Sequence, residues 1–192
     1  GGAVGGTTAG AEPLTLTAGT AGDITFGGAV GASRLGALTI ASAHDVTAQA
    51  GLTAAALAQA TGTGTTTLNG PVNTDTAAGV ALTTSAITLN ADLTTTGGGT
   101  VTLTNGGLLT LNGSISADGA VTQAGAGPTT VTGTRSVVTT GDAVDFATAL
   151  TLSGGALSVD TTGAALVPAG ADITFGGAVG GTTAGAEPLT LT

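Results

Sequence analysis

The segment Ile24-Thr25-Phe26-Gly27 is the first clear copy of a motif that recurs along the chain. A typical copy has an aliphatic residue, a threonine, a second apolar residue and then a small or polar residue. The eight central threonines are Thr25, Thr47, Thr67, Thr88, Thr110, Thr130, Thr151 and Thr174. Their successive positions differ by 22, 20, 21, 22, 20, 21 and 23. A period of about 20 residues is typical of the coils of a β-solenoid.

The alternation within each motif predicts which side chains point inward. Successive side chains of a strand face opposite sides, so the residues that flank the threonine point one way and the threonine points the other. We therefore predict an all-β fold, a parallel β-helix with about 22 residues per coil and coils stacked about 4.8 Å apart. The threonines form an outer column, and Asn69, Asn90 and Asn112 belong to a second polar column beside it.

Two further strands per coil are predicted from later apolar positions. The second column contains Val30, Leu52, Val72, Leu93, Ile115 and Val179, with Val137 and Leu157 as substitutes in the two coils that interrupt it. The third strand falls at residues 38–40, 80–82, 101–103, 120–122, 144–146 and 189–191. Residues 52–60 have helix-forming composition, but the threonine period on either side predicts solenoid there as well.

A long exact repeat predicts the organisation of the chain. Residues 1–17 are identical to residues 176–192, so the sequence begins again at an offset of 175. This identity predicts that residues 1–192 form one continuous solenoid segment, cut from a longer tandem array with eight coils in each 175-residue unit. The expected partners are adjacent copies of the unit, joined end to end or bundled laterally.

Composition argues against several classes of function. The chain has 36 Gly, no Cys and a net charge of −9, and Arg34 and Arg135 are its only basic side chains. This charge disfavours nucleic acid and electrostatic binding to anionic membranes. No apolar run approaches the ~20 residues that a membrane helix needs. His44 is the only histidine. It is interpreted as a solvated corner residue, so we expect no catalysis.

Three aspartates are the candidate metal ligands. Asp23, Asp45 and Asp172 precede strand motifs at similar outward positions. Carboxylate oxygens suit Ca²⁺, and stacked like charges are unfavourable unless a cation or solvent screens them. The simpler interpretation is that the three carboxylates are solvated, because each site offers few ligands. No other cofactor is predicted.

The strings DITFGGAVG, TTTLNGPV and LLTLNGSI carry a family resemblance. The chain resembles the repeat regions of the filamentous haemagglutinin-like adhesins and related β-strand-repeat exoproteins of bacteria. That resemblance implies a right-handed β-helix, located outside the cell or on its surface, that serves as a fibre or adhesin stalk. Host or cell-surface glycans are further expected partners.

The outer threonine face leaves a second class of function open. Threonines at β-solenoid spacing resemble ice-binding faces, and the same face also suits a glycan. The expected contact face contains the eight central threonines together with Asn69, Asn90 and Asn112. A polysaccharide-processing β-helix ranks behind both, because such enzymes need clustered charged groups and aromatic platforms, whereas Phe26, Phe146 and Phe175 are the only aromatic residues.

Overall fold

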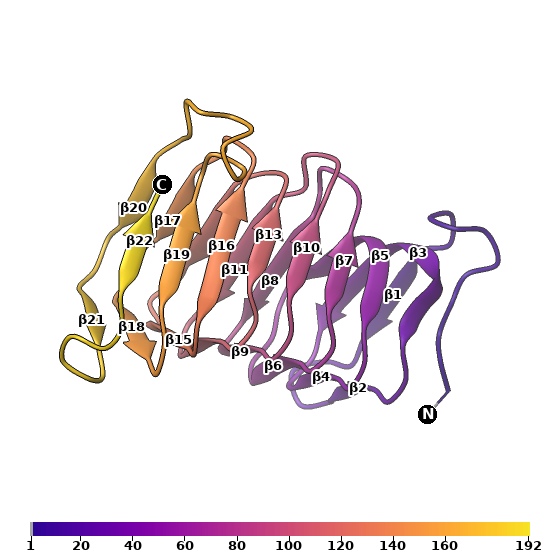
Figure 1. Cartoon of the computed structure of the whole chain (residues 1–192). Helices are drawn as coiled ribbons and strands as arrows, with labels where there is room; N and C mark the ends of the chain where they lie inside the picture. Colours follow the sequence, from indigo (N-terminus) through magenta and orange to yellow (C-terminus); the bar gives the residue numbers. More distant parts are fainter. Residues whose placement is uncertain (1) are drawn as a thin grey trace.

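The chain forms a single stack of parallel β-coils (Figure 1). The structure is a computed structural model that describes residues 2–192, and these residues contain 22 strands and no helix. Adjacent coils pair through parallel backbone ladders, as the threonine period predicts. The predicted fold class, a parallel β-helix with the expected coil length, is confirmed.

One side of each coil belongs to an eight-stranded parallel sheet, here named the Thr face. Its strands are short because a glycine or another corner residue follows each motif. In spatial order they are β2 (Ile24–Phe26), β4 (Val46–Ala48), β6 (Thr65–Leu68), β9 (Ala86–Leu89), β12 (Leu109–Leu111), β15 (Thr129–Thr132), β18 (Leu150–Ser153) and β21 (Val179–Gly181).

The other two sides belong to one folded 14-stranded sheet. The second face contains β7 (Val72–Thr74), β10 (Leu93–Thr95), β13 (Ile115–Ala117), β16 (Arg135–Thr139), β19 (Leu157–Asp160) and β22 (Leu189–Leu191). The third face contains β1 (Leu14–Thr17), β8 (Val80–Thr84), β11 (Val101–Asn105), β14 (Val121–Ala124), β17 (Val144–Phe146) and β20 (Ile173–Phe175). Two long strands, β3 (Val30–Ser42) and β5 (Leu52–Gln59), run across the corner and join these faces.

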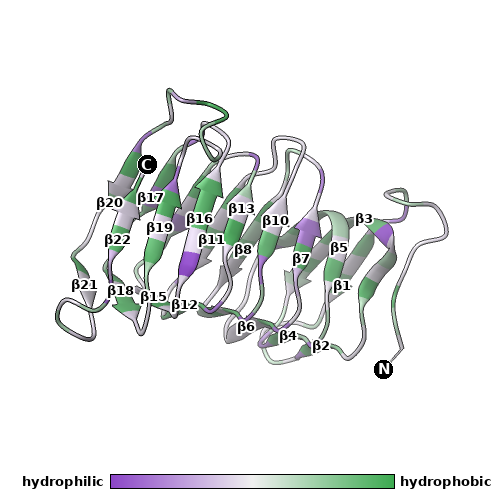
Figure 2. Ribbon diagram, viewed as in Figure 1, coloured by the Kyte–Doolittle hydropathy of each residue, from purple (hydrophilic) through white to green (hydrophobic). Residues whose placement is uncertain are grey.

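Apolar side chains from all three faces meet inside the stack. On the second face Val72, Leu93, Ile115 and Val137 follow one another in register, and each is at most 3% exposed. Figure 2 shows the resulting alternation of apolar and polar residues along the strands. Because the core is one coil wide, mostly small and branched aliphatic side chains fill it, together with Phe26 and Phe146.

The predicted second column is confirmed as far as Val137. In the next coil its place is taken by Val159, and Leu157 instead lies in register with Arg135. The prediction that residues 52–60 belong to the solenoid, despite their helix-forming composition, is confirmed, because β5 covers Leu52–Gln59.

The final coil differs from the predicted one. β20 pairs with β17 on the third face, β21 pairs with β18 on the Thr face, and β22 pairs with β19 on the second face. Three predictions are therefore wrong: Thr174 does not continue the threonine column, Val179 does not continue the second column, and residues 189–191 do not supply a third-face strand.

A long connection causes this difference. β19 ends at Asp160 and β20 begins only at Ile173, whereas β7 ends at Thr74 and β8 already begins at Val80. Residues 161–172 form a loop that projects from the stack (Figure 1), so the chain reaches the third face only at Ile173. Val4 bridges to Val30 on the second face, while its copy Val179 lies on the Thr face. The two copies of the repeated segment are therefore not separated by a whole number of coils, and the prediction of eight coils in each 175-residue unit is wrong.

Candidate functional site

Seven of the eight predicted threonines form one column on the Thr face. Their backbones are in register from strand to strand, in the order Thr25, Thr47, Thr67, Thr88, Thr110, Thr130 and Thr151. Their side chains are exposed or half-exposed, while the flanking apolar residues of the central strands are buried. The column therefore presents a regular row of hydroxyl and methyl groups to solvent.

The eighth threonine lies elsewhere. Gly180 follows Thr151 in the column, and Thr174 is paired with Asp145 on the outer surface of the third face. The cause is the displaced β20, whose Phe175 ring stacks on Phe146 at a centroid separation of 5.8 Å and an interplanar angle of 3°. This stack holds the Thr174 strand on the third face.

A ladder of side-chain amides runs beside the threonine column. Asn69 Nδ2 donates to Gln49 Oε1 at 3.1 Å. Asn90 Nδ2 donates to Asn69 Oδ1, and Asn112 Nδ2 donates to Asn90 Oδ1, both at 2.7 Å. The predicted Asn column is confirmed as a chain of hydrogen bonds. Gln49 also belongs to this ladder, which was not predicted, although Gln49 stands two residues after Thr47, as each Asn does after its own threonine.

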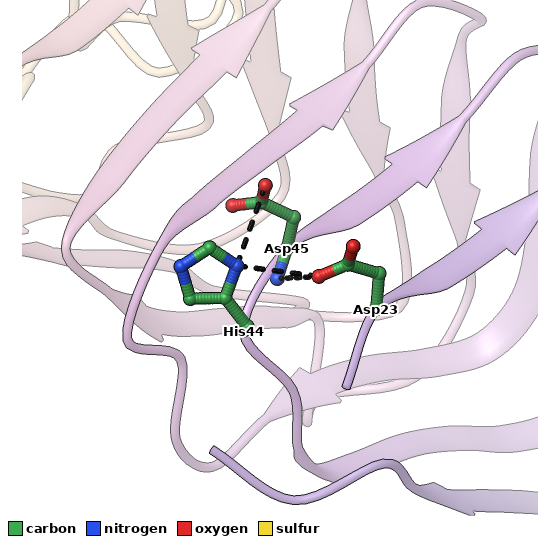
Figure 3. Close-up of side chains that lie close together, drawn as sticks. All are labelled: Asp23, His44 and Asp45. Atoms are coloured by element: carbon green, nitrogen blue, oxygen red, sulfur yellow. Dashed lines mark hydrogen bonds and ion pairs between the residues drawn. The ribbon is translucent and has the colours of Figure 1, made fainter. Parts of the chain in front are cut away.

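Two of the three candidate calcium ligands come together, and a histidine joins them (Figure 3). Asp23 and Asp45 lie in adjacent coils at the corner where the chain enters the Thr face. Asp172 is remote from them, because it precedes β20 on the third face, where its carbonyl accepts a hydrogen bond from Val144 N. The expectation that Asp172 shares their position is wrong for the same reason as for Thr174.

His44 is more than a solvated corner residue. Its Nδ1 lies 3.2 Å from Asp23 Oδ1 and 3.5 Å from Asp45 Oδ2. The three side chains are 43–60% exposed, so solvent reaches the cluster. The signal in the sequence was its position directly before Asp45, one coil after Asp23, which the parallel stacking of coils brings together.

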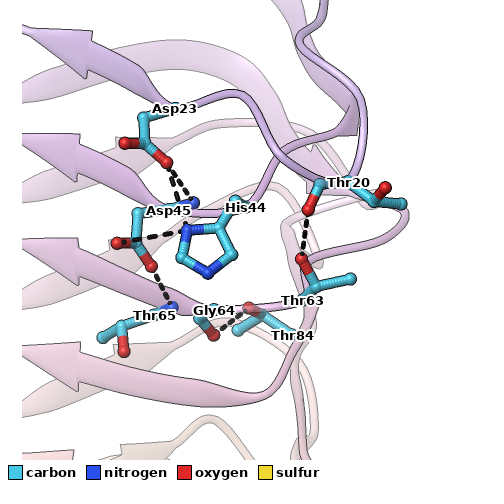
Figure 4. A network of polar contacts seen from close by, with 8 residues as sticks. All are labelled: Thr20, Asp23, His44, Asp45, Thr63, Gly64, Thr65 and Thr84. Atoms are coloured by element: carbon cyan, nitrogen blue, oxygen red, sulfur yellow. Dashed lines mark hydrogen bonds and ion pairs between the residues drawn. The ribbon is translucent and has the colours of Figure 1, made fainter.

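The aspartates at these corners also hold neighbouring coils together (Figure 4). Asp23 Oδ1 accepts a hydrogen bond from Asp45 N at 3.0 Å, and Asp45 Oδ1 accepts one from Thr65 N at 2.6 Å. At another corner Asp118 Oδ2 accepts from Gly98 N at 2.8 Å, and this contact, followed by the Thr140 hydroxyl, lowers the pKa of the Asp118 carboxyl. The carboxylates thus occupy backbone donors of adjacent coils.

Arg34 serves the same purpose. Its Nε lies 3.1 Å from Asp75 Oδ2, and its Nη1 donates to Ala54 O at 2.7 Å. Its Nη2 donates to Asn73 Oδ1 at 2.5 Å. The guanidinium therefore links three successive coils.

No pocket occurs on the surface formed by residues 2–192, and the same residues contain no helix long and apolar enough to cross a membrane. The polar groups are arranged in rows along the stack, and the Asp23–His44–Asp45 cluster is the one place in this described part where three potential metal ligands converge. Comparison of the chain with models of known protein families, with curated proteins and with solved structures finds no match.

Proposed function

We propose that this chain is a non-catalytic structural segment of an extracellular fibre or adhesin stalk. One observation carries the proposal: the outer polar side chains bond from coil to coil along an uninterrupted stack. The amide ladder of Gln49, Asn69, Asn90 and Asn112 is the clearest case. Such bonds stiffen a rod along its axis. The Thr face has eight strands. Its seven steps span about 34 Å at about 4.8 Å per step.

The ends of the stack suit continuation by another copy. β2 and β21 are the edge strands of the Thr face, and β20 and β22 are edge strands of the other sheet. Edge strands present unpaired backbone N–H and C=O groups, which favour pairing with a further strand. Addition of an identical segment would extend the parallel ladders and give a filament.

One variant tests end-to-end association without disturbing the fold. Leu150 N donates to Ala178 O, and Thr182 N donates to Leu152 O. Backbone groups of successive residues in a strand point to opposite sides, so the Val179 N–H points away from β18 and toward the open edge. Val179→Pro removes that donor, and Val179→Thr is the matched control that retains it. We expect sedimentation velocity and negative-stain electron microscopy to show concentration-dependent rods for the parent chain and the Thr variant, and weaker association for the Pro variant. A monomer at every concentration would contradict the proposal.

The extracellular location rests on the resemblance of the DITFGGAVG, TTTLNGPV and LLTLNGSI strings to surface-protein repeats. Antibodies against the chain should label the surface of intact source cells. Labelling only after permeabilisation would contradict this part of the proposal, and it would leave the filament test unaffected.

The threonine column favours a second candidate function, a module that binds ice or a glycan. The seven stacked threonines form a regular row along one parallel sheet, an arrangement that suits an extended ligand. Thr88→Lys places a charge in the middle of this row, and Thr102→Lys on the third face is the control. Thermal hysteresis, or glycan binding, that is lost in the first variant and kept in the second would establish this function over the stalk.

A further inference from the structure

The corner that leads into the first two strands of the Thr face holds Asp23, His44 and Asp45 (Figure 3). One ring nitrogen, His44 Nδ1, faces oxygens of both carboxylates at 3.2 and 3.5 Å. A neutral imidazole nitrogen carries at most one hydrogen, so it can donate to only one of these oxygens. Asp23 Oδ1 also accepts a hydrogen bond from Asp45 N at 3.0 Å. We propose that the three side chains form a binding site for a divalent transition metal ion of the zinc class, with water completing the coordination.

The spacing of the ligand atoms suits such an ion. Zn–N and Zn–O bonds of about 2.0–2.2 Å in a tetrahedron place neighbouring ligand atoms about 3.4 Å apart. The two separations measured from His44 Nδ1 lie on either side of this value, and all three ligand atoms lie within 4.8 Å of one another. A metal ion therefore fits between the side chains after small rotations of the carboxylates.

Backbone contacts hold the ligands in place. The backbone of His44 is fixed on both sides, because its backbone N–H donates to Gly22 O at 2.7 Å and its backbone carbonyl accepts from Gly64 N at 2.9 Å. Thr65 N holds Asp45 by Oδ1, which leaves Oδ2 free to face the imidazole. Hydrogen bonds that orient ligands in this way raise metal affinity.

The ligand set selects among cations. Ca²⁺ takes six to eight oxygen ligands, whereas this cluster supplies one imidazole nitrogen and two carboxylates. Imidazole together with carboxylate suits Zn²⁺, Co²⁺ and Ni²⁺. The net charge of −9 favours the binding of any cation. Arg34 is paired with Asp75, so its positive charge is not placed at the cluster. The site thus takes a transition metal in preference to the calcium that the aspartates alone suggest, and the bound ion links the first two coils.

The chain supplies its own matched control for the test. Asp172 stands in the same nine-residue sequence, DITFGGAVG, as Asp23, but its position on the third face has no histidine beside it. The experiment uses the whole 192-residue chain and titrates Co²⁺ by visible absorption and Zn²⁺ by calorimetry. His44→Ala and the isosteric Asp23→Asn remove ligands, and Asp172→Asn changes charge equally without touching the site.

We expect one ion per chain, visible Co²⁺ bands, and affinity that falls about tenfold or more in the His44 and Asp23 variants. The Asp172 variant should keep its affinity within about twofold of the parent, because it leaves the ligands and their hydrogen bonds intact. Excess Ca²⁺ should leave the Co²⁺ spectrum unchanged. Circular dichroism confirms that each variant folds. Absence of binding at millimolar metal, equal loss in the Asp172 variant, unchanged affinity without His44, or displacement of Co²⁺ by Ca²⁺ would each overturn the assignment.

Discussion

The same nine residues, DITFGGAVG, occur at 23–31 and at 172–180 and occupy different places in the coil. In the first copy Ile24–Phe26 lies on the Thr face and Val30 on the second face. In the second copy Ile173–Phe175 lies on the third face and Val179 on the Thr face. The comparison shows that a strand motif specifies a strand and its inward residues, but not the face of the solenoid to which the strand belongs.

The surroundings of the two copies explain the difference. Val30 is covered by Leu52 on one side and bridged by Val4 on the other, and it is 1% exposed. Val179 lies in the last coil with a neighbour on one side only and is 39% exposed. Val30 is therefore enclosed between two coils, whereas Val179 lies at the open end of the stack.

The projecting loop before the second copy sets that position. Asp160 Oδ1 accepts hydrogen bonds from Thr162 N at 2.7 Å and from Thr162 Oγ1 at 2.6 Å. Ala164 and Ala165 adopt positive φ angles of 58° and 69°, which disfavour a strand, and Leu166 is 84% exposed. A loop held in this form contributes no strand to the third face. The next motif, Ile173–Phe175, therefore supplies the third-face strand of this coil.

The largest expected effect is an all-or-none difference in cross-linking. The double variant Thr151→Cys with Gly180→Cys changes two positions that are paired on the Thr face, and the short thiol cross-linker dibromobimane should join them. Thr151→Cys with Thr174→Cys should not cross-link, because Thr174 lies on another face. The native chain has no cysteine to interfere. Mass spectrometry of the products checks the register, and the opposite pattern would show that the two copies are equivalent after all.

Removal of the ring beneath the second copy should have the next largest effect. Phe146 is 1% exposed and stacks on Phe175. Phe146→Ala should lower the free energy of unfolding by about 3–5 kcal/mol, because it leaves a cavity and frees Phe175. Urea unfolding followed by circular dichroism measures this change. A Phe146→Leu control should lose less, and a change below about 1 kcal/mol in the alanine variant would contradict the packing.

Equivalent valines of the two copies should respond unequally. Val30 is buried at a site closed on both sides, whereas Val179 is partly exposed in the last coil. Val30→Ala should lower the free energy of unfolding by about 2 kcal/mol, because it removes buried methyl groups. Val179→Ala should lower it by about 0.5 kcal/mol at most, as is usual for surface substitutions. The same urea experiment compares the two variants, and equal losses would mean that both valines have the same surroundings.

The smallest expected effect concerns the two copies of a local loop. Thr7 Oγ1 donates to Glu12 Oε1 at 2.6 Å, and the corresponding contact between Thr182 Oγ1 and Glu187 Oε1 is 2.8 Å. The Thr7 hydroxyl is the main cause of the lowered pKa of Glu12, and the Thr183 N–H is the main cause for Glu187. Gly154 N also donates to Glu187 at 3.1 Å and ties that loop to an adjacent coil.

A lowered carboxyl pKa fixes the sign of the pH dependence. The ionised Glu12 and Glu187 carboxylates stabilise the folded chain at pH values above the ordinary glutamate pKa of 4.5. This stabilisation is lost as pH falls through the lower folded-state value. Carbon-detected NMR titration should show both carboxyls titrating below the ordinary value. Glu187→Gln should disturb the amide signal of Gly154, whereas Glu12→Gln should disturb only its own loop. Titration at or above the ordinary value would contradict the hydrogen bonds.

Much of the fold follows from the sequence because the threonine period and the two-residue alternation are local. They predicted strands on the Thr face from β2 to β18, the second-face column as far as Val137 and the Asn column. The site was harder to predict: the stacking of adjacent coils indicated the Asp23–Asp45 pair, but His44 lacked a recognisable motif. Its meeting with both carboxylates depends on the path of the corner before β4.

The sequence by itself determined what a segment forms with its near neighbours. The TTAGAE segments at 7–12 and 182–187 make the same threonine–glutamate contact in both copies, because the two partners lie within one short loop. Tertiary structure alone decided the face on which each copy lies. Strand ladders form between residues a whole coil apart, so a motif joins whichever face the previous coil leaves unpaired. The loop at 161–172 precedes the change of face, and the threonine–glutamate contact is kept in both copies.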